Sequence, residues 1–176
     1  FDDAGNSRAG VRYVYVQDTT APEILIDLNG YVPGTWSNTR VTWNLSATDN
    51  LTSSDNIQFQ RNYAGGAEGT TWYNCSNESS FIGQYNWNMS FRAIDEAGNV
   101  SEIGPFNVKV DNVVPTEPTV NLNNYTEGDW TDQPININLE STDHMSGIQK
   151  YQYQLDNDGI WIDMTSDTLE LDGNYN

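Results

Sequence analysis

The chain has 176 residues and is strongly acidic, because 25 Asp and Glu residues outnumber 7 Lys and Arg residues and give a formal net charge of -18. Such a chain repels phosphate backbones and anionic lipid surfaces, so we expect neither nucleic-acid binding nor membrane insertion. Aromatic residues make up 12% of the sequence, which is typical of a packed core rather than of disorder. Cys75 is the only cysteine, which excludes an intrachain disulfide and leaves the role of this thiol open.

Short segments in which apolar and polar residues alternate recur along the chain. In chain order, their apolar positions lie in Val41–Ala47, Phe106–Val110, Ile135–Leu139 and Tyr151–Leu155. A period of two with one apolar face predicts half-buried antiparallel strands. Turn sequences such as "LNGYVPG" and "EAGN" separate these segments, and no window has a helical period. The sequence therefore predicts an all-β fold.

Several motifs occur twice, about one small domain apart. "DDAGN" at Asp2 returns as "DEAGN" at Asp95, and "DTTAP" at Asp18 returns as "DNVVP" at Asp111, each 93 residues later. "TWSNTRVTWNLSATDN" matches "DWTDQPININLESTDH", and "GQYN" matches "GNYN", at nearly the same separation. A constant offset across separate motifs indicates a tandem repeat with this period.

The motif series resembles the bacterial immunoglobulin-like (Big-type) tandem repeats of surface and extracellular proteins. It runs "DxAGN", a final apolar strand, "D-x-x-x-P", "W[ST]" and then "[AS]TD", and the resemblance covers the whole chain. It implies tandem immunoglobulin-like antiparallel β-sandwiches of about seven short strands each. It also implies an extracellular location, either on a bacterial cell surface or secreted.

The phase of the repeat predicts three segments. Residues 1–18 correspond to the last strands of a preceding repeat, namely its F–G turn and strand G, and residues 19–111 to a complete repeat. Residues 112–176 correspond to a second repeat without its last two strands, so we expect the chain to be a piece of a longer array. An incomplete sandwich exposes a sheet edge. Strand-swapped self-association, with residues 1–18 filling that gap in cis or in trans, is one prediction; local pairing of residues 1–18 is the alternative.

In such a sandwich the incoming linker, the loop after the second strand and the turn before the last strand meet at one pole. In the complete repeat that pole gathers oxygen-bearing side chains at Asp18, Asp49, Asp95, Glu96 and Asn99, and in the second repeat at Asp111 and Asp143. Ca²⁺ takes six to eight oxygen ligands in flexible geometry, so these residues are candidate calcium ligands. Local turn chemistry, with Asp capping backbone N–H groups, explains the same residues without a metal.

Two kinds of tryptophan are expected. Trp43 alternates onto the apolar face of its strand and should lie in the core. Trp36 and Trp130 occupy equivalent positions of the two repeats, which suggests that both pack beside a linker.

The sequence favours a non-catalytic function. His144 is the only histidine, and neither a zinc site nor a nucleophile elbow is present. The first hypothesis is adhesion, through binding of a host protein or glycan such as a glycoprotein or an immunoglobulin. The alternative is a passive, calcium-stiffened stalk or spacer that carries a distal enzyme or adhesin domain. In both cases the neighbouring repeats of the same chain are partners.

Overall fold

A computed structural model describes residues 2–13, 16–64, 71–76, 78–80, 83–155 and 159–172. In these residues the fold is all-β, with one 3-10 turn, η1 (Ser54–Asn56), and no helix long and apolar enough to cross a membrane. The chain forms two compact units, Phe1–Pro33 with Val41–Ser80 and Trp87–Asn107, and Gly34–Arg40 with Phe81–Asn86 and Val108–Asn176. The strands are β1 (Glu23–Asp27), β2 (Trp36–Ser37), β3 (Thr42–Thr48), β4 (Gln58–Ala64), β5 (Tyr73–Cys75), β6 (Glu78–Ser80), β7 (Tyr85–Ile94), β8 (Val100–Val110), β9 (Thr119–Asn121), β10 (Ile135–Glu140), β11 (Gln152–Tyr153), β12 (Ile162–Asp163) and β13 (Thr168–Leu171).

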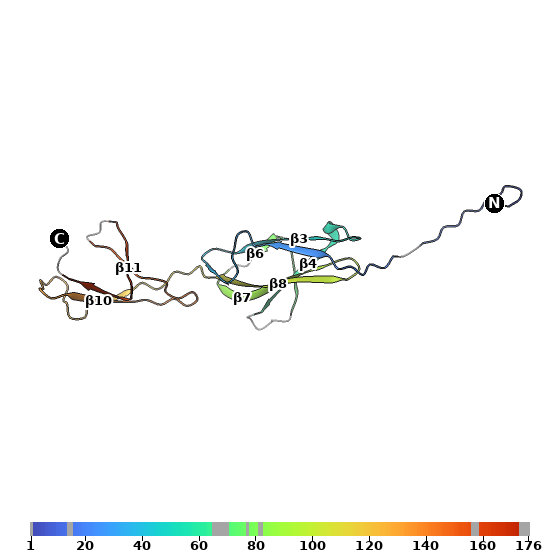
Figure 1. The fold of residues 1–176 in the computed structure, drawn as a ribbon. Helices are drawn as coiled ribbons and strands as arrows, with labels where there is room; N and C mark the ends of the chain where they lie inside the picture. The colour runs from blue at the N-terminus through green and yellow to red at the C-terminus, as the bar shows by residue number, and fades with distance from the viewer. Residues whose placement is uncertain are drawn as a thin grey trace. The chain divides into compact units, whose positions relative to one another are not determined.

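The first unit has strands in two layers, which is consistent with a β-sandwich. One sheet has the order β1-β3-β6, and β1 and β3 pair antiparallel. A second sheet contains β8, β7, β4 and β5 in that order. Figure 1 shows β3 and β6 in one layer and β7 and β8 in the other.

The core of the first unit follows the alternation that the sequence predicts. Val41, Trp43, Leu45 and Ala47 are buried, and the residues between them are exposed. The rings of Trp43 and Phe91 are 5.3 Å apart and tilted by 59°, so this pair joins β3 of one sheet to β7 of the other. The prediction that Trp43 is a core residue is therefore confirmed.

One glycine in β8 is required by close packing. Gly104 has a φ of +113°, and a Cβ at this position would lie 2.8 Å from the carbonyl oxygen of Met89 on β7. Any other residue would push the two strands apart, so Gly104 sets how closely β8 approaches β7.

The second unit has smaller sheets and a more open interior. β10 lies between β13 and β9, and β11 pairs with β12. The predicted strand at Ile135–Leu139 is confirmed as β10, yet its apolar side chains are only half-buried. Beside them lies an open apolar cavity of about 350 Å³, and Trp130 is fully exposed. Trp36 at the equivalent position is 38% exposed, and the Lys109 ammonium lies 5.6 Å from its ring centroid.

The same turn follows β1 and β9. Asn29 and Asn123 both have a φ of +52°, and each backbone N–H donates a 2.8 Å hydrogen bond to the side-chain oxygen of the residue two positions earlier. Tyr31 N–H to Leu28 O and Tyr125 N–H to Leu122 O are both 3.0 Å. The two turns therefore have the same local geometry, and the tandem repeat itself stays a prediction.

The N-terminal segment is exposed at residues 2–13, 16 and 17. Residues 2–13 and 16–18 form no strand, and Val11, Tyr13 and Val16 are between 76% and 81% exposed. Strand-swapped self-association, by which these side chains would be covered, stays a prediction, as do the boundaries at residues 18 and 111.

Candidate metal centre

The first acid lies in the linker that leads into β1. Asp18 Oδ1 accepts a 3.1 Å bond from the Thr20 N–H, an Asx turn that fixes the side chain against its own backbone. The other oxygen, Oδ2, is buried and has no hydrogen-bond partner. Asp18 Oδ1 is therefore engaged by the local backbone, and Asp18 Oδ2 is available to a ligand.

The second acid ends β3. Asp49 Oδ1 accepts bonds from the N–H groups of Leu51 at 3.0 Å and Thr52 at 2.8 Å. These two bonds, with that of Thr52 the stronger influence, lower the pKa of Asp49, because they favour the charged carboxylate. Asp49 Oδ2 is buried without a partner, as Asp18 Oδ2 is.

The third acid begins the tight turn between β7 and β8. Asp95 is 5% exposed, and its two oxygens accept bonds from the Asn99 N–H at 2.7 Å and the Asn99 amide Nδ2 at 2.8 Å. The same Nδ2 lies 3.3 Å from Asp18 O and 3.2 Å from Thr20 O. Asn99 thus ties the linker to the turn with its amide nitrogen.

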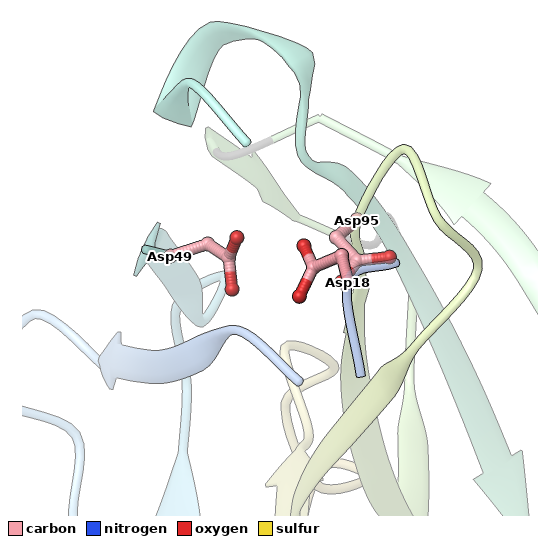
Figure 2. A group of neighbouring side chains, drawn as sticks. All are labelled: Asp18, Asp49 and Asp95. Atoms are coloured by element: carbon pink, nitrogen blue, oxygen red, sulfur yellow. The ribbon is translucent and has the colours of Figure 1, made fainter. Parts of the chain in front are cut away.

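Asp18, Asp49 and Asp95 converge at one place. Each offers a carboxylate oxygen, and these oxygens all lie within 4.8 Å of one another. Figure 2 shows the carboxylates of Asp49 and Asp18 pointing toward one another, with Asp95 beside Asp18. Sequence positions far apart are brought together because a linker, a loop and a turn end at the same pole of the unit.

The remaining predicted ligand of this pole points to a different partner. Glu96 Oε1 accepts a 3.0 Å bond from the Asn56 amide of η1, and the Glu96 N–H donates to the Thr52 hydroxyl at 3.3 Å. Glu96 therefore closes the loop after β3 over the turn and is not in the group formed by the three aspartates. Nothing in the sequence signalled the roles of Thr52 and Asn56.

In the second unit, the carboxylates of Asp111 and Asp143 both accept a hydrogen bond from the same backbone N–H. The Ser146 N–H lies 2.9 Å from Asp111 Oδ2 and 2.8 Å from Asp143 Oδ1. Asp111 Oδ1 also accepts from Gln84 Nε2 and, at 3.2 Å, from the Val113 N–H. Asp111 is 6% exposed, and the bonds from Ser146, Val113 and Gln84 lower its pKa to about 2. Protein donors already satisfy this carboxylate.

The donor set of the first unit fits a hard divalent cation. Three carboxylates at this separation repel one another unless a positive charge neutralises them. Two buried oxygens without a donor are costly in a folded protein, and a cation removes that cost. All the side-chain ligands are oxygens, which Ca²⁺ prefers, and loops supply its flexible geometry.

Comparisons with known proteins leave the chain without a named relative. No protein-family model matches it, no curated protein matches it, and no solved structure matches it. The function must therefore be argued from the residues themselves.

Proposed function

We propose that the chain is a non-catalytic spacer of a bacterial extracellular protein, built from tandem Big-type immunoglobulin-like sandwiches with a joint stiffened by calcium. The observation that carries this proposal is the meeting of Asp18, Asp49 and Asp95, with two buried oxygens that lack a donor. One of the three residues lies in the linker. A cation held by all three would therefore fix the linker to the body of the unit.

The protein's own bonds prepare the joint for this role. Asn99 already connects its turn to two linker carbonyls, Asp18 O and Thr20 O. Calcium would add carboxylate links to the same segment, so the linker would lose bending freedom in proportion to occupancy. A string of units with such joints behaves as a rod, which projects a distal domain away from its anchor.

The tandem arrangement is supported by sequence and by local geometry. The 93-residue offset aligns β3 with β10, and each is the central strand of a three-stranded sheet. The turns at Asn29 and Asn123 have equal dihedral angles and equal hydrogen bonds.

Calcium binding and linker stiffness can be measured separately. Calorimetric titration of the EGTA-treated chain should give one calcium site, which Asp49→Asn removes and Asp132→Asn, on an exposed loop, retains. Small-angle X-ray scattering should show a narrower distribution of conformations with calcium than with EGTA. Absence of binding heat would overturn the calcium joint, and binding without a change in scattering would overturn the stiffening.

Recognition of a host protein or glycan is a second candidate function. One observation favours it: Arg92, on the outer face of the sheet that contains β7, forms no ion pair with any carboxylate of the described residues. A guanidinium without a carboxylate partner is available to an anionic ligand.

A further inference from the structure

A row of three side chains crosses the outer face of the β7-β4-β5 part of the sheet. Arg92 on β7 lies opposite Gln60 on β4, and Gln60 lies opposite Asn74 on β5. Arg92 Nε donates to Gln60 Oε1 at 2.7 Å, and Gln60 Nε2 donates to Asn74 Oδ1 at 2.8 Å. We call these three residues the Arg92 row. Arg92 follows the fully buried Phe91 in the strand alternation, so the row faces away from the core.

The guanidinium of the row is held from a second direction. Arg92 Cζ lies 4.5 Å from the ring centroid of Trp72. A cation over an indole face is attracted by the ring electrons, and a planar guanidinium stacks on it. Since Gln60 and Trp72 fix the plane of Arg92 together, a ligand would not have to order this long side chain on binding.

The end of the guanidinium remains available. An arginine has five N–H donors, and the bond to Gln60 uses only the one on Nε. Among the described residues no other acceptor engages Arg92, so both Nη groups can donate to one ligand. Two parallel N–H donors match the two oxygens of a carboxylate, and such a bidentate pair is the strongest that arginine makes.

The neighbours of Arg92 select among carboxylate ligands. Gln60 and Asn74 are neutral amides, which donate to and accept from hydroxyl groups. The row contains no carboxylate of its own, whereas the chain as a whole carries 25. A guanidinium with two parallel N–H donors, lying beside two amides, therefore matches a ligand with one carboxylate and several hydroxyls.

We propose that the Arg92 row binds a carboxylate-bearing sugar, a sialic or uronic acid residue of a glycan. The sugar carboxylate accepts from the two Nη groups, and its hydroxyls bond to the amides of Gln60 and Asn74. This site gives a chemical class to the ligand of the recognition function proposed above and does not depend on the calcium joint. The negative charge of the rest of the chain repels such a ligand, so we expect the affinity of the Arg92 row to be low.

Saturation-transfer NMR on the whole chain tests the site with sialyllactose, a uronic acid disaccharide and neutral lactose. In salt of about 0.15 M, at least one acidic sugar should bind, and lactose should bind about tenfold more weakly because it lacks the carboxylate. The two acidic probes distinguish sialic from uronic acid. The measurement is repeated in EGTA, where the calcium joint is empty and binding should persist.

Matched variants locate the binding. Arg92→Gln should weaken binding of the acidic sugar by about tenfold or more, while Arg8→Gln, which removes the same charge from the exposed N-terminal segment, should not change it. Gln60→Glu places a carboxylate beside Arg92 without changing its size and should also abolish binding. Circular dichroism checks that each variant is folded. If Arg92→Gln does not fold, Gln60→Glu tests the site in its place.

Three outcomes would overturn the proposal. The first is no binding of either acidic sugar at about 10 mM, which is weaker than any useful affinity. The second is equal binding of lactose and the acidic sugars. The third is unchanged binding by a folded Arg92→Gln or Gln60→Glu chain.

Discussion

The two acidic poles begin from the same sequence signature and reach different chemistry. In the first unit the carboxylates of Asp18 and Asp49 each keep one buried oxygen without a donor. In the second unit both oxygens of Asp111 are occupied by donors from Gln84, Val113 and Ser146. A linker aspartate can therefore have both oxygens engaged by protein donors or keep one oxygen without a donor, and the side chains around it decide which.

The units also differ in how well they exclude water. The central strand β3 buries Trp43 to 1% exposure, whereas the apolar side chains of the equivalent β10 are half-buried beside an open cavity. Trp43→Ala should lower the free energy of unfolding of the first unit by about 3–5 kcal/mol. Ile137→Ala should cost the second unit only about 1–2 kcal/mol, because less apolar surface is removed from the interior.

Amide hydrogen exchange at increasing urea concentration, read in β3 for the first unit and in β10 for the second, measures both losses. Ser46→Ala, on the exposed face of β3, is the control and should change little. Equal losses for the two core variants would mean that the second unit is as well packed as the first.

Calcium should distinguish the poles sharply. A ligand at about 100 times its dissociation constant stabilises the folded state by about 2.7 kcal/mol. We therefore expect calcium to raise the melting temperature of the first unit by about 10–20 °C. In calorimetric melts, Asp95→Asn should remove this response, and Asp143→Asn should leave it unchanged. The reverse pattern would mean that calcium binds at the pole of the second unit.

Low pH tests the pole of the second unit, whereas calcium tests the pole of the first. The pKa of Asp111 is lowered from 3.8 to about 2 in the folded chain, so its charged form stabilises the fold above the unfolded pKa. That contribution is present at pH 5 and is lost as the pH falls from about 4 through about 2. Asp111→Asn should flatten this part of the pH profile of the second unit in denaturation experiments. A variant with the same acid sensitivity as the parent chain would show that other carboxylates dominate.

The smallest effect is expected at the amide that ties the linker. Asn99→Ala removes the bonds to Asp18 O and Thr20 O and to the carboxylate of Asp95, at a net cost of about 1 kcal/mol. Amide hydrogen exchange should be faster in residues 18–20 and unchanged in β10. Unchanged exchange in the linker would show that its position does not depend on Asn99.

Much of this fold could be predicted from alternation and repetition alone. The pattern from Val41 to Ala47 predicts a strand, and the structure confirms it as β3. Trp130 shows the limit, because its similarity to Trp36 predicts packing beside a linker, yet it is fully exposed. Equivalent positions are packed alike only when the neighbouring strands are also present, and a sequence motif does not contain that information.

The site was predictable in outline and not in detail. Topology places a linker, a loop and a turn at one pole, and Asp18, Asp49 and Asp95 meet there. The direction of each side chain was not predictable, since it depends on single hydrogen bonds. Glu96 bonds to Asn56, and the amide nitrogen of Asn99 faces the linker carbonyls. The Arg92 row was not predictable, because its members are spread over three strands whose register the sequence does not specify.

The turn of the "DxAGN" motif occurs twice, in very different surroundings. At Asp2 every residue of the turn is exposed, whereas at Asp95 the turn connects β7 to β8 and Asp95 itself is buried. Both copies nevertheless have the bond from the Gly N–H to the Asp carbonyl and the bonds from the Asn to the Asp carboxylate. The five residues thus close by themselves, and a hairpin forms in about 1–10 microseconds. During synthesis, the β7–β8 pair of the first unit would begin from a turn that is already bent, before the sheet that receives it has assembled.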